Sequence, residues 1–389
     1  MNIDPLLHEW TPELTAWRRD FHAHPELGYQ EHRTAARVAE HLAEFGLEVA
    51  TGIGGTGVVG TLRCGSGNRA IALRADMDAL PMDEANGFDH RSQAPGRMHG
   101  CGHDGHTTML LAAARYLATT RRFSGTVHFI FQPAEEGGGG AARMIEDRLL
   151  DRFPFDAIFG AHNDPNLPVG TVSASPGTVN AASDTLTIRL TGKGGHAARP
   201  HQAIDPIVAG AQIVLGLQTI VARRVAPTDS AVISICTFNA GSAHNVIPET
   251  AILGGTVRTL RPDIQDQLAR EIPDLVRGLA AASDTEAEVS YARGYPPVVN
   301  DQTMAEAMAI AAASVVGADR VRTTLPASMG GEDFAYYALA RPACFFRIGQ
   351  SEPEKGNIPL HHPRYDFNDA ILPIGGALFA AIAEQELPA

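Results

Sequence analysis

The chain has 389 residues, of which 44% are hydrophobic and 19% are charged, and its formal net charge is −13. These values are typical of a globular protein with a sizeable core, and the length indicates two or three structural units. No run of Lys or Arg could follow a phosphate backbone, so nucleic-acid binding is not expected.

The start of the chain lacks a charged segment followed by an apolar one, so no signal peptide is predicted. The most apolar late stretch, residues 370–383, contains Gly and Pro and is too short to span a bilayer, so it predicts a buried helix. The four cysteines form no CxxC pair and no disulfide framework. We therefore expect a cytoplasmic protein without membrane contact.

The N-terminal third alternates between helical and strand patterns. Ala35, Val38 and Leu42 recur at helical spacing, and Gly46 is a suitable C-cap residue. Strands are predicted in residues 47–51, 57–63, 70–76 and 126–133, and a helix in residues 107–120. Apolar strands that alternate with helices are typical of an α/β domain.

The middle of the chain follows a different order of elements. Strands are predicted in residues 185–192, 231–241, 250–260 and 286–293, and helices in residues 205–223 and 262–283. This βαββαβ order is that of the ferredoxin-like fold. We therefore predict a two-domain α/β protein, in which a catalytic domain of residues 1–183 and 294–389 is interrupted by a ferredoxin-like domain of residues 184–293.

The densest group of chemically active residues is HGCGHDGH, residues 99–106. Cys101 and His103 are suitable ligands for zinc-like metals, and the glycines allow tight backbone turns that direct both side chains to one point. A glycine-rich turn with surface histidines is the alternative. We expect His99 and His106 to be supporting or structural groups.

A second group is FQPAEEGGGG, residues 131–140, in which an apolar strand ends at a Pro and two carboxylates follow. Catalytic groups in open α/β sheets gather at the carboxyl ends of strands. Neighbouring Glu135 and Glu136 could divide the work, one binding metal and the other deprotonating an attacking water. A solvated charge pair is the alternative, although a plain loop does not need four glycines.

Three further positions complete the candidate metal site. His162 follows an apolar run, where a core histidine is the alternative, and His361 and His362 precede a Pro. Asp76 and Asp78 follow a strand, where an Asp could orient a ligand His or form an Asx turn. Together with the two groups above, these residues predict a metal centre.

Residues 52–57, GIGGTG, fit the dinucleotide-binding pattern G-x-G-x-x-G, with Asp76 about 20 residues further on. The following residues, 58–63, predict a strand and not the helix whose N-terminus would hold a pyrophosphate. Nucleotide binding is therefore not expected.

These motifs resemble the aminoacylase and carboxypeptidase family of metallopeptidases, and they are most similar to its branch of hippurate hydrolase and plant auxin-conjugate hydrolases. The similarity covers almost the whole chain, through RRDFHAHPELGYQE, RADMDALPM, HGCGHDGH, FQPAEEGGGGA, GKGGHAARPH, MGGEDFAYY and LHHPRYDFND. Motifs in this number and order are highly specific.

The resemblance implies two divalent ions per subunit (Mn, Zn, Co or Ni), with the inserted domain as a lid. It assigns the metal ligands to Cys101, His103, Glu136, His162 and His361. It makes Glu135 the general base and Asp78 its supporting residue near the metals. In the lid, it implies that His196 stabilises the oxyanion, often across a dimer interface, and that Asn245 and Arg258 contact the substrate. The final motif usually reads His-Ser-Pro, so His362 leaves open a competition with His361.

We therefore expect a metal-dependent amidohydrolase that cleaves small N-acyl amino acids, such as hippurate or N-acetyl amino acids, as a homodimer or homotetramer assembled through the lid. One alternative is a dipeptidase or N-acyl-diaminopimelate-type deacylase with the same two-metal site. The other is a non-catalytic binding protein on the same fold. That would require the loss of Glu135 or of a ligand, and every expected position is filled.

Overall fold

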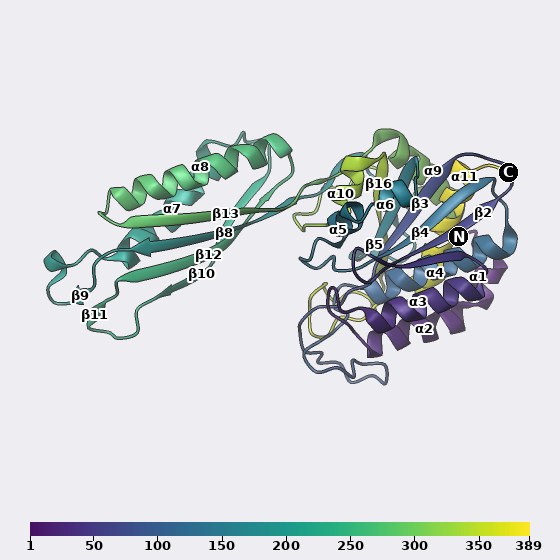
Figure 1. Cartoon of the computed structure of the whole chain (residues 1–389), viewed down its shortest axis with the longest axis horizontal. Helices are drawn as coiled ribbons and strands as arrows, with labels where there is room; N and C mark the ends of the chain where they lie inside the picture. Colours follow the sequence, from purple (N-terminus) through teal and green to yellow (C-terminus); the bar gives the residue numbers. More distant parts are fainter. The chain divides into compact units, whose positions relative to one another are not determined.

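The computed structural model describes all residues from 1 to 389, and the chain divides into two compact units (Figure 1). Unit 1 comprises residues 1–177, 299–326 and 333–389, and unit 2 comprises residues 178–298 and 327–332. The short strands β7 (Gly177–Asn180) and β14 (Val298–Asn300) contain two of the four points at which the chain passes between the units.

Unit 1 is built on an eight-stranded sheet with the strand order β1-β2-β4-β3-β5-β16-β6-β15. Its strands are β1 (Glu48–Ile53), β2 (Gly57–Cys64), β3 (Ala70–Asp76), β4 (Gly125–Gln132), β5 (Ala157–Pro168), β6 (Val172–Ser173), β15 (Val321–Arg322) and β16 (Ala343–Ser351). β4, β3, β5 and β16 are parallel, whereas β1 and β2 are antiparallel additions. This mixed sheet confirms the α/β class, and the predicted strands lie where the apolar runs indicated them.

Helices of unit 1 cover this sheet. They are α1 (Pro5–Glu9), α2 (Thr11–Ala23), α3 (His32–Glu44), α4 (His103–Thr120), α5 (Gly140–Glu146), α6 (Leu149–Arg152), α9 (Gln302–Val316), α10 (Ala335–Ala340) and α11 (Leu372–Glu386). Because side chains alternate along a strand, Ile71 and Leu73 of β3 enter the apolar core shared with α4 and α11. Arg74 points to the opposite face, where it donates to Asp333 just before α10.

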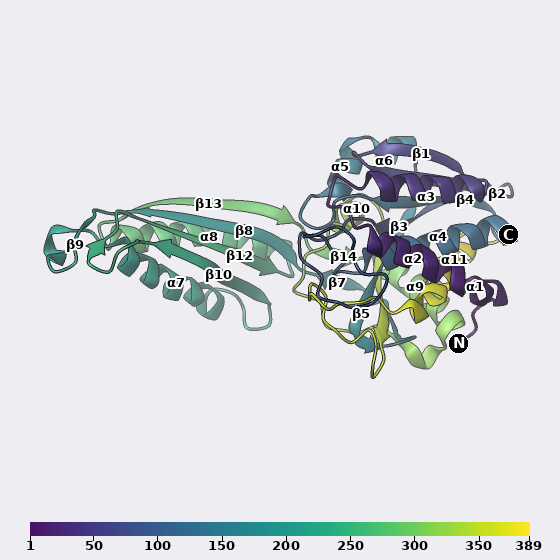
Figure 2. The ribbon, with the colours of Figure 1, turned by 90° about the horizontal axis from the view of Figure 1, so that it is seen from below.

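Unit 2 has the element order β8 (Ala182–Thr191), β9 (Gly195–His196), α7 (Pro206–Arg223), β10 (Ala231–Ala240), β11 (Val246–Ile247), β12 (Thr250–Thr259), α8 (Pro262–Ala281) and β13 (Glu286–Tyr295). Four strands form an antiparallel sheet in the order β10-β12-β8-β13. α7 and α8 lie on one face of it (Figure 2). Leu186, Ile188 and Leu190 alternate along β8 and face the core that both helices share.

α7 is the one helix that is long and apolar enough to cross a membrane, by length and composition alone. Ala209, Ile213, Leu217 and Ile220 are buried along one side of this helix, in the core of unit 2. We therefore interpret α7 as a packing helix of unit 2.

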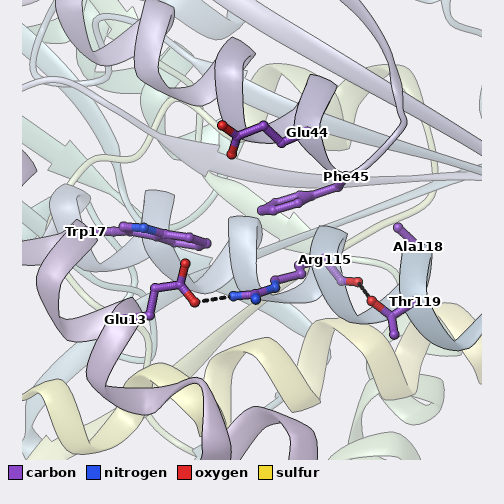
Figure 3. Close-up of a pocket in the computed structure, with 7 residues that line it drawn as sticks. All are labelled: Glu13, Trp17, Glu44, Phe45, Arg115, Ala118 and Thr119. Atoms are coloured by element: carbon purple, nitrogen blue, oxygen red, sulfur yellow. Dashed lines mark hydrogen bonds and ion pairs between the residues drawn. The ribbon is translucent and has the colours of Figure 1, made fainter.

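A pocket of about 410 Å³ opens on unit 1 among α2, α4 and the end of α3 (Figure 3). Arg115 donates to Glu13 at 2.6 Å, and its guanidinium lies 4.1 Å from the centre of the Trp10 ring. The residues that line the pocket include no His or Cys, so the candidate metal chemistry lies elsewhere.

Candidate functional site

The predicted metal ligands lie at the carboxyl ends of the parallel strands of unit 1. Cys101 and His103 flank the start of α4, Glu136 follows β4, His162 lies in β5, and His361 follows β16. Loops from neighbouring parallel strands meet at this edge of a sheet, which is where α/β proteins bind ligands.

The structure brings these five side chains together. The ligand atoms of Cys101, His103 and His162 lie within 4.8 Å of one another, and so do those of Cys101, Glu136 and His361. The Sγ atom of Cys101 is 3.4 Å from Nε2 of His162, and Nε2 of His361 is 3.2 Å from Oε1 of Glu136. Because Cys101 belongs to both groups, the five residues form one continuous cluster.

Gly102 permits the close approach of Cys101 and His103. Its φ of 100° lies in the left-handed region, which glycine adopts without a steric penalty. A Cβ atom at this position would lie 2.4 Å from Oδ1 of Asn163 and 2.7 Å from the Tyr365 hydroxyl. Any other residue would therefore displace the turn that carries both ligands.

Asp78 connects the two halves of the cluster. Its Oδ1 lies 3.2 Å from Nδ1 of His103, and its Oδ2 accepts a hydrogen bond from the backbone N–H of Glu136 at 2.9 Å. An ionised carboxylate only accepts, so Nδ1 of His103 donates to Asp78, and Nε2 is the ring atom that a metal ion would bind in place of a proton. Nε2 of His103 is buried without a hydrogen-bond partner, which is the condition of an atom suited to a metal ion.

The electrostatics of the cluster also favour a cation. Burial, together with the carboxylates of Glu136 and Glu135, raises the pKa of the Cys101 thiol well above its usual range. Burial opposes the charged ring of His103, but Asp76 and other carboxylates outweigh it and raise the pKa of His103 to about 10. A hydrogen bond to Glu136 likewise raises the pKa of His361. A bound cation would relieve this excess of negative charge.

His106 lies behind the predicted ligand His162. Nδ1 of His106 is 2.6 Å from Oδ1 of Asp76, and Nε2 is 2.7 Å from Oδ1 of Asn163. The backbone carbonyl of Asn163 lies 2.7 Å from Nδ1 of His162. Asp76 therefore orients His106, whereas Asp78 orients the predicted ligand His103.

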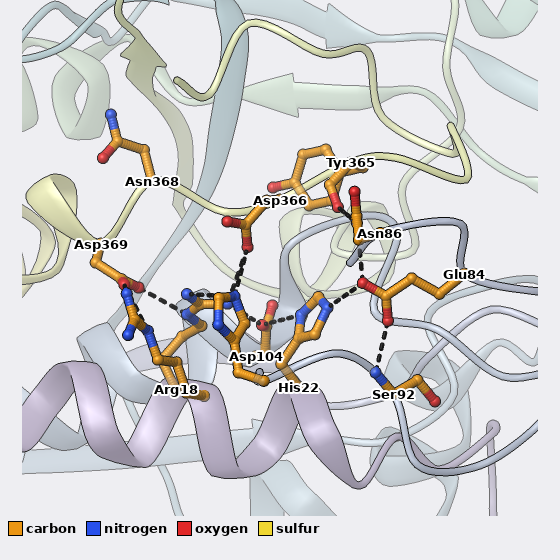
Figure 4. Close-up of polar contacts among 12 residues, drawn as sticks. Arg18, His22, Glu84, Asn86, Ser92, Asp104, Tyr365, Asp366, Asn368 and Asp369 are labelled. Carbon is orange, nitrogen blue, oxygen red and sulfur yellow. Dashed lines mark hydrogen bonds and ion pairs between the residues drawn. The ribbon is translucent and has the colours of Figure 1, made fainter. Parts of the chain in front are cut away.

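A buried charge network at the start of α4 was not predicted from the sequence (Figure 4). Nδ1 of His22 lies 2.8 Å from Oδ2 of Asp104, and Nε2 lies 3.2 Å from Oε1 of Glu84. Arg18 donates to Asp369 at 2.7 Å. Because Asp104 directly follows His103, this network holds the first turn of α4. Arg18 and His22 lie within the family-like motif of residues 18–31, but their partners are far away in the sequence.

The paired histidines of the last motif differ in position. His361, with a φ of 62°, lies against Glu136, whereas Nδ1 of the exposed His362 accepts from the backbone N–H of Arg364 at 3.0 Å. The structure therefore places His361 in the cluster and not His362.

The three predicted lid residues belong to unit 2. His196 is exposed on β9 and pairs with Val246 of β11, and the carbonyl of Asn245 accepts from the N–H of Ala197 at 3.1 Å. Arg258 lies on β12 opposite Ser183. His196 and Asn245 are therefore neighbours, whereas Arg258 lies near the other end of the sheet.

Comparison with known proteins identifies the family of this chain. A model of peptidase family M20/M25/M40 matches residues 72–385. The chain is 39% identical to hippurate hydrolase of Campylobacter jejuni over 387 residues, which cover 100% of both chains. It is also 39% identical to IAA-amino acid hydrolase ILR1-like 5 of Arabidopsis thaliana, over 95% of this chain and 86% of that protein.

A solved structure agrees over the whole length. The YXEP protein of Bacillus subtilis, described as a dinuclear metal binding peptidase from the M20 family, superposes with a TM-score of 0.82 at 35% identity. The superposition covers 98% of this chain and 99% of that one. The resemblance predicted from the motifs is confirmed, and the chain belongs to peptidase family M20/M25/M40.

Proposed function

We propose that the protein is a metal-dependent amidohydrolase that cleaves N-acyl amino acids to a carboxylate and a free amino acid. The cluster of five ligand side chains, with the buried Glu135 beside it, is the observation that carries this proposal. The relatives named for hydrolysis of hippurate and of IAA-amino acids support the substrate class.

Two divalent ions fit the residues of the cluster. Cys101, His103, Glu136, His162 and His361 would hold them, and the thiolate, imidazole and carboxylate donors suit Zn²⁺, Mn²⁺, Co²⁺ or Ni²⁺. The unpartnered Nε2 of His103 and the approach of His361 to Oε1 of Glu136 support this assignment. When bound, such ions polarise the scissile carbonyl and lower the pKa of water.

Glu135 is placed to move the proton that hydrolysis requires. Its side chain is buried beside the ligand Glu136, and its ligand atom lies within 4.8 Å of those of His103 and Glu136. Glu135 takes a proton from the water as its oxygen bonds to the amide carbon, and then passes that proton to the nitrogen, so that the C–N bond breaks and the amine leaves.

Unit 2 would act as a ferredoxin-like lid, because its β8-α7-β10-β12-α8-β13 order and its sheet order β10-β12-β8-β13 fit that fold. The half-buried Arg258 donates only to the carbonyls of Asp184 and Val257 and forms no ion pair. Its guanidinium is therefore suited to hold the carboxylate of the substrate in a bidentate contact. Asn245 would contribute a further polar contact.

His196 would serve a second subunit. Arg258 pairs with Ser183 at one end of β8, whereas His196 lies beyond Thr191 at the other end. At about 3.3 Å per residue, these positions are about 25 Å apart or more. A rigid lid cannot bring both to one metal centre, so His196 would stabilise the oxyanion in the site of a partner.

A second copy of the chain is the partner that unit 2 favours. β10 is an edge strand of ten residues, and edges of this length invite pairing. Val232 and Phe238 on β10 are more than one-third exposed, and Leu215 on the adjacent α7 is 72% exposed. Antiparallel pairing of two β10 strands about a twofold axis would bury these apolar groups.

The replacement Glu135→Gln tests the proposed base. We expect kcat for hippurate to fall by about 10²–10⁴ while bound metal is retained, because the amide can hold its place but cannot accept the proton. Glu146→Gln, at an exposed position in α5, is the matched control and should leave kcat unchanged. Wild-type turnover by Glu135→Gln, or full activity in protein shown to be metal-free, would contradict the mechanism.

Mixing of two inactive variants tests the shared site. Glu135→Gln subunits retain His196, and His196→Ala subunits retain the base, so mixed dimers contain one complete site. Partial recovery of activity after subunit exchange is expected. No recovery, despite exchange verified by mass spectrometry of the mixed dimer, would show that each chain completes its own site.

A further inference from the structure

The turn that carries Glu135 contains a residue in a strained conformation. Ala134 has a φ of 51°, and a non-glycine residue in this left-handed region costs about 1 kcal/mol or more. The turn is closed by hydrogen bonds from Gly137 N to Glu135 O and from Gly140 N to Ala134 O, at 2.7 and 3.1 Å. Neighbouring structure must therefore hold this turn in place.

One contact comes from Glu31, which begins α3. Its fully buried carboxylate accepts from the N–H of Ala134 at 2.8 Å and from the hydroxyl of Thr56 at 2.5 Å. Burial of a carboxylate is unfavourable unless its oxygens are hydrogen-bonded. Both oxygens of Glu31 accept hydrogen bonds, and one of these comes from the N–H of Ala134, the residue that precedes Glu135.

A second contact comes from Tyr29. Its hydroxyl donates to the carbonyl of Gly138 at 2.8 Å. The ring lies against Gly55 and Gly138, since a Cβ atom on either glycine would be 3.2 Å from a ring carbon. Gly28 also lies against the turn, because a Cβ atom at position 28 would be 3.0 Å from the Cβ atom of Ala134.

The contacts fall on alternate residues of the turn. Glu31 holds the N–H of Ala134, Asp78 holds the N–H of Glu136, and Tyr29 holds the carbonyl of Gly138. Glu135 lies between the first two of these fixed points. Its backbone direction is therefore set by groups from two distant loops.

We propose that Glu31 and Tyr29 are positioning residues for the general base: they clamp the turn of residues 134–138 so that the carboxylate of Glu135 is fixed relative to the metal ligands. The inference rests on the proposed role of Glu135 as the base. Misplacement of a catalytic group by about 1 Å can cost about 10²-fold in rate. The clamp therefore acts on kcat and leaves substrate affinity unchanged.

The test compares Glu31→Ala, Glu31→Gln and Tyr29→Phe by kcat, KM, metal content and thermal stability. Glu31→Ala should lower kcat by about 10- to 100-fold, with KM within about twofold and unchanged metal content. Glu31→Gln should restore kcat to within about threefold, since its amide oxygen still accepts from Ala134. Tyr29→Phe keeps the ring between the glycines and should lower kcat by about 3- to 10-fold.

Glu26→Ala is the matched control. Glu26 lies in the same loop, and its carboxylate accepts from the N–H groups of Arg33 and Thr34, away from the turn. It should lower the melting temperature and leave kcat unchanged. An equal fall of kcat in Glu26→Ala, or a wild-type kcat in both Glu31→Ala and Tyr29→Phe, would overturn the proposal.

A double-mutant cycle separates the clamp from a general structural effect. In the Glu135→Gln background no base remains to be positioned, so adding Tyr29→Phe or Glu31→Ala should not lower kcat further. A second, independent fall would overturn the clamp. Wild-type turnover of Glu135→Gln alone would instead contradict the proposed base, so the two failures are distinguishable.

Discussion

His22 should make the stability of unit 1 decrease at alkaline pH. Burial disfavours the charged ring, but Asp104 and Glu84 outweigh burial and raise the pKa of His22 to about 9, against about 6.5 in an unfolded chain. Between these values the folded state holds one more proton than the unfolded state. The free energy of unfolding therefore falls by about 1.4 kcal/mol per pH unit, or about 3 kcal/mol over the window.

Because the pKa of His22 is raised in the folded state, its contribution to the free energy of unfolding is complete below about pH 6.5 and is lost as the pH rises through about 9. Urea unfolding can be followed by tryptophan fluorescence, because Trp10 and Trp17 both lie in unit 1. EDTA should be present, since bound metal would add its own pH dependence. The stability difference between wild type and His22→Gln should shrink by about 3 kcal/mol from pH 6.5 to 9. A constant difference would refute a charged His22.

Further substitutions test the site and the packing. Cys101→Ala should lower the metal content per subunit, whereas Cys344→Ala, at a buried thiol in β16, should keep it; equal metal content in both would remove Cys101 from the ligand set. Arg258→Ala should weaken binding of acyl amino acids more than binding of the matching amides that lack a free carboxylate, and equal losses would argue against carboxylate recognition. Gly105→Ala places a Cβ atom 2.1 Å from Phe367 and should destabilise unit 1 by about 1–3 kcal/mol in urea unfolding. Gly278→Ala, in open space on α8, should stabilise unit 2 by about 0.8–1 kcal/mol, so the opposite order would contradict the packing argument.

The sequence was most informative where chemistry and local periodicity coincide. Apolar runs predicted β3 and β4, and the residue types after them predicted Asp78 and Glu136 at the ends of those strands. Gly46, predicted as a C-cap, has a φ of 81° just beyond α3. Such features depend only on neighbouring residues, so they can be inferred from one chain.

The supporting contacts could not be inferred in the same way. Glu31 is 103 residues from Ala134 in the sequence, and Arg18 is 351 residues from Asp369. The sequence does not distinguish a buried Glu or Arg from an exposed one, and only the tertiary fold determines which partner each side chain contacts. The motif of residues 18–31 was therefore visible as a resemblance, but its physical task was not.

The interruption of unit 1 by unit 2 also has a consequence for synthesis on the ribosome. β5 is bordered by β16, and Ile158 pairs with Ala343, so the partner strand is made only after unit 2. At about 5–20 residues per second, the apolar edge of β5 stays uncovered for about 10–40 s in each nascent chain. Four of the predicted ligands are made by the end of β5, and His361 emerges last. Until β16 is made, the nascent chain therefore exposes an unpaired strand edge to which chaperones can bind. Any free metal ion meets an incomplete set of predicted ligands during the same interval.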